Sequence, residues 1–190
     1  MKPIGKTAVI IVLTLVAGTS VLGDQSDFNY RRRGDQQWKL SFGIGENHTI
    51  PRGTHVPHLE FNVATGEFEK FISPRTAIGY ELSLAGQTNN GDNDGISVFL
   101  NHTRYFFVHG RFSADYKLGL GVMQLHDIVR GQATKSNFNE QLGVGIQYAT
   151  SANSAITLGY TLYHASNAGM ERPNHGINAT IFAVGLTYYR

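Results

Sequence analysis

Residues 155–166, AITLGYTLYHAS, alternate between large apolar side chains and small or polar ones. A repeat of two residues predicts a β-strand, because successive side chains of a strand point to opposite faces. One face carries isoleucine, leucine and tyrosine, and the other carries alanine, threonine and glycine. His164 and Ser166 continue the apolar phase, so we expect both polar side chains on the apolar face of this strand.

The same alternation recurs along the chain. Five further segments show it clearly, at 38–45, 76–84, 116–123, 142–148 and 182–188. Two less regular segments complete the set: 56–63, with an apolar phase of Leu59, Phe61 and Val63, and 95–108, with apolar residues on both phases. An even number of antiparallel strands closes into a barrel without a free edge. The predicted fold is all-β, an eight-stranded antiparallel β-barrel.

The composition of the two faces predicts which of them lines the barrel. A soluble, ligand-carrying barrel fills its interior with large apolar side chains, whereas small residues suit the narrow lumen of eight strands. If the small residues line the lumen, the large apolar face is exposed and must meet lipid. We therefore expect a transmembrane barrel. Its lumen-phase polar residues, which we expect to form a paired structural plug, are Glu60, Glu81, Lys117 and Gln141.

The N-terminus has the features of a secretory signal peptide. Lys2 and Lys6 precede the apolar run 8–16, which is too short to span a bilayer as a helix. We expect a signal peptide at 1–23 and one barrel domain at 24–190, located in the bacterial outer membrane. Short turns at the periplasmic side and longer outer loops are typical of such barrels. The expected outer loops are GENHTIPRGTH, GQTNNGDND, HDIVRGQATKS and HASNAGMERPNHG, and the expected turns are ATGEFEK, VHGR and ATSANS.

The composition also excludes several kinds of chemistry. The chain has no cysteine, which removes disulfides, thiolate ligands and a thiol nucleophile. The net charge of +2 comes from scattered basic residues, so nucleic acid is not an expected partner. No metal site is expected either, because His55 and His58 are three residues apart and would point to opposite sides of a strand.

His164 and Ser166 are candidates for a base and a nucleophile. Polar groups turned toward the outer leaflet cost desolvation unless something uses them. On the antiparallel strand that returns after the loop, Asn178 shares the outward phase and is expected beside them. A serine esterase also needs donors for the oxyanion of its tetrahedral intermediate. The candidates for that role are Asn167, Asn174 and loop amides near Gly169. A hydrolase that faces the leaflet would act on a lipid ester.

The stretch 164–178, HASNAGMERPNHGIN, resembles the signature of the lipid A 3-O-deacylase (PagL) family. That signature is His-x-Ser-Asn-Ala, a short spacer and Pro-Asn-x-Gly. The matching residues are His164, Ser166, Asn167, Ala168, Pro173, Asn174 and Gly176. The resemblance implies an outer-membrane esterase with a serine nucleophile, a histidine base, an orienting glutamate and no metal or other cofactor. It also implies lipid A, the anchor of lipopolysaccharide, as the partner, and it leaves a homodimer open.

One departure from the family pattern concerns the orienting residue. The family glutamate falls at Asn178, whose neutral amide can orient an imidazole but cannot balance the charge of an imidazolium. In a serine protease triad, an Asp-to-Asn change costs roughly 10⁴-fold in rate. Glu171 is a candidate substitute, and His175 is a weaker one. Two functions remain open: an active esterase, or a non-enzymatic barrel of the same family with a decayed site.

Overall fold

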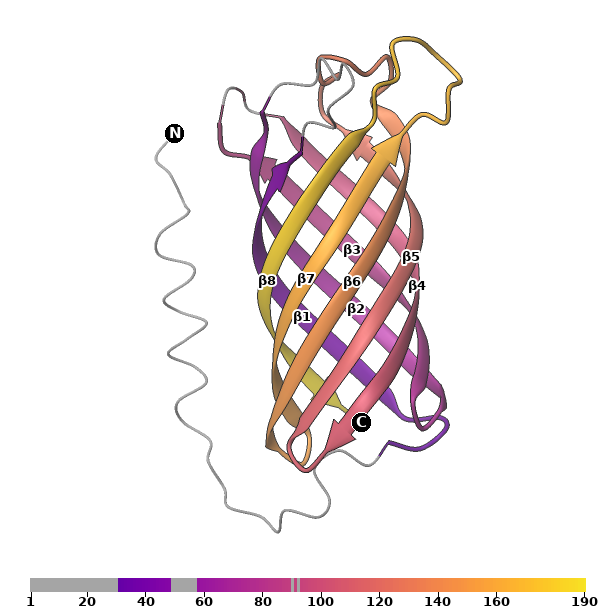
Figure 1. Ribbon diagram of the computed structural model, residues 1–190, viewed down its shortest axis with the longest axis vertical. Helices are drawn as coiled ribbons and strands as arrows, with labels where there is room; N and C mark the ends of the chain where they lie inside the picture. Colours follow the sequence, from indigo (N-terminus) through magenta and orange to yellow (C-terminus); the bar gives the residue numbers. More distant parts are fainter. Residues whose placement is uncertain (1–30, 49–57, 90, 92) are drawn as a thin grey trace.

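The computed structural model describes residues 31–48, 58–89, 91 and 93–190. The predicted signal peptide, 1–23, lies outside these residues. No helix in the described part of the chain is long and apolar enough to cross a membrane. The described residues form a closed antiparallel barrel of eight strands, as predicted (Figure 1). The strands are β1 (Gln36–Asn47), β2 (Glu60–Ser73), β3 (Thr76–Gln87), β4 (Asp94–His109), β5 (Phe112–Leu125), β6 (Ser136–Ser151), β7 (Ser154–Ser166) and β8 (Ile177–Tyr189).

The ring closes where the first strand pairs with the last. β1 and β8 pair from Gln37 opposite Tyr189 to Asn47 opposite Ala179. This closure gives every strand a hydrogen-bonded neighbour on both sides, which a structure in hydrocarbon requires. The loops 126–135 and 167–176 lie at one end of the barrel, and the C-terminus lies at the other end (Figure 1). The short connections at the C-terminal end are 74–75, 110–111 and 152–153.

The outer wall of the barrel is apolar. Leu40 and Leu120 are each 68% exposed, whereas Gln37 and Glu69 are 0% exposed. Soluble proteins show the reverse, with charged groups outside and large aliphatic groups inside. An apolar wall around a polar lumen is what a barrel surrounded by lipid requires. The predicted orientation of the faces is confirmed, and the fold is a transmembrane β-barrel.

The middle of the lumen holds paired charges. Nζ of Lys39 lies 2.8 Å from Glu69 and 3.3 Å from Glu67. Nζ of Lys117 lies 3.5 Å from Glu67 and 2.5 Å from Glu81. Charges that leave water are tolerated when each finds a partner and its remaining hydrogen bonds are satisfied. The predicted polar plug is confirmed for Glu81, Lys117 and Gln141.

The second strand faces the opposite way from the prediction. Leu59 and Val63 are buried, with 6% and 5% of their surface exposed, and Glu60 is exposed on the outside. The stretch 64–70, expected to be a turn, lies inside β2, and its Glu67 points into the lumen. The turn prediction was wrong because acidic residues that pair with lysines across the lumen look, in sequence alone, like a polar turn. The predicted facing was wrong because Leu59 packs into an apolar cluster inside the loop-bearing end of the barrel.

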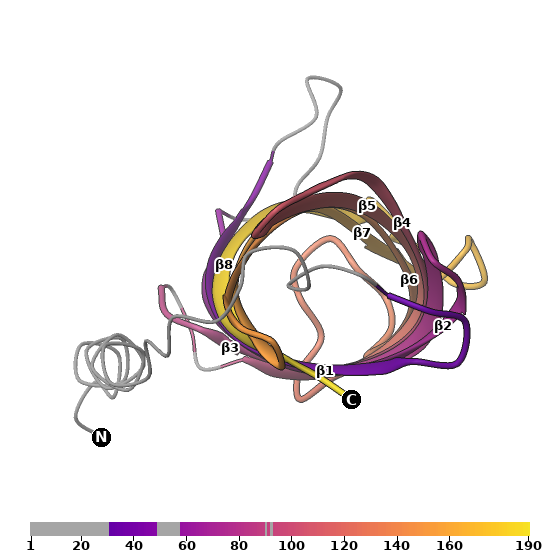
Figure 2. The same cartoon turned by 90° about the horizontal axis from the view of Figure 1, so that it is seen from below.

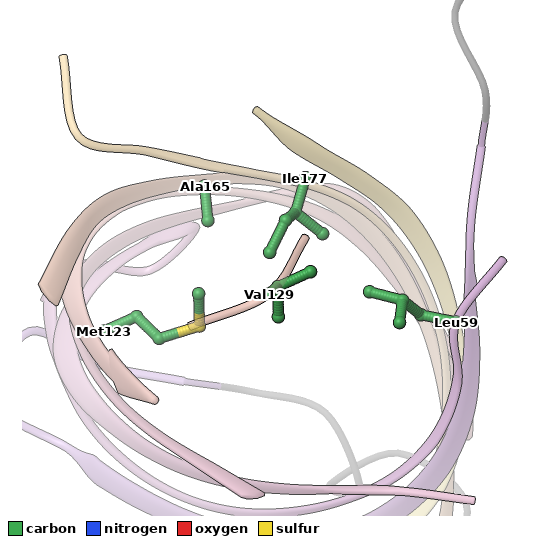
Figure 3. Close-up of a cluster of buried hydrophobic side chains, with 5 residues drawn as sticks. All are labelled: Leu59, Met123, Val129, Ala165 and Ile177. Carbon is green, nitrogen blue, oxygen red and sulfur yellow. The ribbon is translucent and has the colours of Figure 1, made fainter. Parts of the chain in front are cut away.

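The loop 126–135 closes the loop-bearing end of the lumen. It bends inside the ring of strands, which is visible along the barrel axis (Figure 2). Val129 of this loop is 7% exposed. It belongs to an apolar cluster with Leu59, Met123, Ala165 and Ile177 (Figure 3). This cap leaves the loops and the outer wall as the accessible surfaces of that end.

Substituting Lys39 tests the lumen pairing. In Lys39→Met, Glu69 and Glu67 lose a cationic partner in the lumen, and we expect the free energy of unfolding to fall by about 3–5 kcal/mol. Urea unfolding in lipid vesicles, followed by the fluorescence of Trp38, measures the change. Lys135→Met is the control, because its ion pair with Asp127 at 3.3 Å lies in exposed loop and such pairs contribute about 0–1 kcal/mol. Equal losses in the two variants would contradict a stabilising role of the lumen pairs.

Candidate functional site

The candidate site lies on the outer wall at the loop-bearing end of β7. His164 and Ser166 are partly exposed, and Ala165 between them is 0% exposed on the lumen side. The register places His164 opposite Asn178 of β8 on one side and opposite Glu140 of β6 on the other. Three strands therefore supply the polar side chains of this part of the wall.

The imidazole of His164 is fixed by a hydrogen bond to the neighbouring strand. Its Nδ1 donates to Oδ1 of Asn178 at 2.7 Å. The backbone carbonyl of Asn178 in turn accepts the N–H of His48 at 2.7 Å, and the His48 ring contacts Thr180. With the proton on Nδ1, the other ring nitrogen, Nε2, keeps its lone pair free to accept a proton.

Ser166 follows His164 on the same face, at a strand spacing of roughly 7 Å. It pairs in register with Phe138 of β6, whose ring is exposed on the outer wall. The serine hydroxyl forms no hydrogen bond with a described residue, so it is not bonded to the imidazole in this structure. Catalytic hydrogen bonds in a site without substrate are often long and tighten only when substrate is bound.

Asn167 holds the loop 167–176 in shape. It is 0% exposed, and its Nδ2 donates to the carbonyl of Glu171 at 2.9 Å. Its Oδ1 accepts the N–H of Gly169 at 2.9 Å, and its own N–H donates to Oδ1 of Asn174 at 3.2 Å. Asn167 and the Gly169 amide are thus engaged within the loop. Nδ2 of Asn174 forms no hydrogen bond with a described residue, which leaves it available to a ligand.

The structure does not bring Glu171 to the imidazole. Its side chain is exposed in the loop, and its carboxylate forms no hydrogen bond or ion pair with a described residue. His175 is held by its backbone N–H, which donates to the carbonyl of Gly131 at 3.0 Å. Neither of the two candidate substitutes occupies the position beside Nδ1 that Asn178 fills.

The loop 126–135 supports the loop of the site from behind. Besides the bond between Gly131 and His175, Gln132 and Asn174 form an antiparallel β-bridge. The cap that closes the lumen through Val129 is therefore bonded to the segment that carries Asn174. This contact fixes the backbone of Asn174 relative to the barrel.

Gly176 packs against the imidazole. Its φ of +71° lies in the left-handed region, and a Cβ at this position would lie 2.8 Å from Cε1 of His164. Any other residue would therefore need a strained backbone and would also push the ring. The glycine of the Pro-Asn-x-Gly motif thus has a physical reason: it lets the loop pass close to His164.

Sequence reasoning missed Glu140. It is exposed on the outer face of β6, and the strand predicted from the sequence began two residues later, at Leu142. The signal was available, because Glu140 interrupts an outward phase that is otherwise apolar from Phe138 to Tyr148.

A hollow in the outer wall begins at this site. Glu140, His164 and Asn178 lie along it together, and it extends across the neighbouring strands toward Ile78 on β3. Its apolar lining includes Leu100, Leu118, Leu120, Leu142 and Leu162. Two acid–base groups, the Glu140 carboxylate and the His164 imidazole, thus lie beside a surface that suits a hydrocarbon chain.

Two comparisons with known proteins bear on this site. The sequence model of the family described as Lipid A 3-O-deacylase (PagL) matches residues 58–187, which contain β2 to β7 and nearly all of β8. No curated protein sequence matches the chain.

Solved structures of outer-membrane barrels share the fold. The crystal structure of the outer membrane enzyme PagL has a TM-score of 0.60 and 16% identity, and the match covers 80% of this chain and 97% of that chain. Neisserial surface protein A (NspA) has a TM-score of 0.63 and 8% identity, with coverages of 82% and 98%. The outer membrane protein OprG from Pseudomonas aeruginosa has a TM-score of 0.59 and 10% identity, with coverages of 86% and 99%. At these identities, the structural likeness shows the fold alone.

The packing of Gly176 against the imidazole yields a prediction. In Gly176→Ala, the new methyl group displaces the ring, so we expect loss of the bond from His164 to Asn178. The ¹⁵N resonances of the His164 ring, measured in detergent micelles, report the change. Gly169→Ala is the matched control, since its φ of +79° imposes similar backbone strain but a Cβ there meets no atom within 4 Å. Identical ring resonances in the two variants would refute the role of the glycine.

Proposed function

The chain belongs to the lipid A 3-O-deacylase (PagL) family, and from this premise we propose that it is an outer-membrane esterase that hydrolyses the ester-linked acyl chain at the 3 position of lipid A. The observation that carries the proposal is the bond from His164 Nδ1 to Asn178 on the outer wall. It leaves Nε2 as a base on the same face as Ser166.

The location of the site supports a lipid substrate. The apolar wall is immersed in the outer membrane, and the site lies at its loop-bearing edge. With the long loops outside the cell, this edge borders the outer leaflet, where lipid A resides. The leucine-lined hollow would hold an acyl chain in the plane of the leaflet. The exposed cations Arg130 and Arg172 in the adjacent loops suit the phosphates of the headgroup.

The reaction follows from the roles of the side chains. Oγ of Ser166 attacks the ester carbonyl carbon while Nε2 of His164 takes the hydroxyl proton. Nδ2 of Asn174 donates to the oxyanion of the tetrahedral intermediate. The intermediate collapses to an acyl-enzyme, and the imidazolium returns its proton to the departing sugar oxygen. Water, activated by the same imidazole, then releases the fatty acid. The scheme needs no metal or cofactor.

Asn178 gives weight to a second candidate function. Its amide orients the imidazole but carries no charge to balance the imidazolium that forms when serine attacks. A serine esterase that depended on this residue alone would be slow, because the corresponding change in a serine protease costs roughly 10⁴-fold. The rival function is that of a non-enzymatic outer-membrane barrel that retains the family framework with a decayed site.

Removing the serine hydroxyl tests the esterase proposal. We expect the lipid A of cells that express the native chain to lose one hydroxyacyl group, as measured by mass spectrometry. Ser166→Ala should leave lipid A intact while the barrel still inserts in the membrane, because only the nucleophile is missing. Ser154→Ala is the control for the removal of a hydroxyl on the same strand, at its far end. Deacylation that persists in Ser166→Ala would exclude this serine as the nucleophile.

Restoring a carboxylate separates the two functions. Asn178→Glu places a negative charge beside Nδ1 of His164 and should raise the rate of deacylation. If the native chain is inactive and Asn178→Glu is active, the framework is intact and the native protein is the non-enzymatic barrel. If both are inactive although both insert correctly, the esterase proposal fails.

A further inference from the structure

Glu140 is the only carboxylate that the register places directly opposite His164, within the part of the chain that the structure describes. The two residues occupy adjacent strands and the same outer face. Directly opposed residues of an antiparallel pair have Cβ atoms about 4.5–5.5 Å apart, which brings long side chains into contact range. Both residues also line the same hollow.

The carboxylate of Glu140 is not committed to another partner. It forms no hydrogen bond or ion pair with a described residue, and its neighbour on the far side is Leu120 of β5. A carboxylate at the edge of an apolar wall loses hydration, which is costly unless a cation approaches it. Ester hydrolysis would generate such a cation, the imidazolium of His164, directly opposite Glu140.

Asn178 and Glu140 flank the imidazole from opposite sides. Asn178 accepts the Nδ1 proton at 2.7 Å and so sets the orientation of the ring. This task requires an acceptor but no charge. Balancing the imidazolium requires a negative charge within about 4–6 Å but no particular hydrogen bond. The two tasks, which one carboxylate can perform together, are thus separable between two residues.

Resting on the proposed esterase function, we propose that Glu140 is the positioning residue that stabilises the His164 imidazolium, while Asn178 orients the ring. The pair on either side of His164 then does the work of a single acidic residue. The interaction strengthens at the edge of the lipid, where the effective dielectric constant is lower than in water. The native Asn178 is therefore compatible with an active enzyme.

A double-mutant cycle tests the proposal. The four proteins are the native chain, Glu140→Gln, Asn178→Glu and the double variant, and the substrate is purified lipid A in detergent micelles. We expect Glu140→Gln to lower kcat about 10- to 100-fold in the native background, with little change in KM, because the substitution removes the negative charge that stabilises the imidazolium formed as serine attacks. In the Asn178→Glu background, the same substitution should cost less than about threefold, since the second carboxylate supplies the charge.

Other outcomes overturn the proposal. An equal loss in both backgrounds would assign Glu140 to folding or to general site structure, and a rise in KM with unchanged kcat would assign it to substrate binding. No loss in the native background would show that the carboxylate is idle. Glu46→Gln is the matched control, because Glu46 is an exposed outward carboxylate of β1 at the same end of the barrel, opposite Thr180 rather than His164.

The failure of this inference and the failure of the esterase function are distinguishable. Inactivity of all four proteins in the cycle sinks the esterase function itself, whereas an active native chain whose kcat is unchanged in Glu140→Gln sinks this inference alone.

Discussion

The backbone hydrogen bonds between β1 and β8 are the contacts on which the rest of the barrel depends. In lipid, an open sheet edge has no partner, so the strands must form a complete ring. Once the ring is closed, the alternation of side chains assigns each residue to the wall or to the lumen. The register then decides which side chains are lateral neighbours, and it sets His164 between residues of two other strands.

Strict alternation made most of the barrel predictable, and its failures have local causes. β7 follows the repeat without interruption, so its faces and its neighbour Asn178 were predictable from the sequence. In β2, the carboxylates that point into the lumen made the stretch 64–70 resemble a polar turn in the sequence. In β4, the apolar residues on both phases arise because Phe99 and Tyr105 point inward. A register shift after Tyr105 then leaves Phe106 and Phe107 both exposed, and such an irregularity follows from pairing rather than from local pattern.

The candidate site was predictable in its position but not in its division of labour. The motif located His164 and Ser166, since both continue an apolar phase. It did not show that the Asn167 side chain is hydrogen-bonded within its own loop, because those bonds depend on the left-handed backbone at Ala168 and Gly169. Glu140 was missed because its charge interrupts the apolar repeat, so the predicted strand began only at Leu142. The pairing of Glu140 with His164 therefore could not be anticipated.

The loop 126–135 connects the interior of the barrel to the candidate site on its outer surface. Val129 is anchored among lumen side chains, and the residues that follow it are bonded to the backbone around Asn174. A change in side-chain volume at Ile177 or Met123 would therefore be transmitted to the backbone around Asn174. Residues of the lumen thus bear on the geometry of the candidate site, and a redesign confined to the outer wall would leave them unaltered.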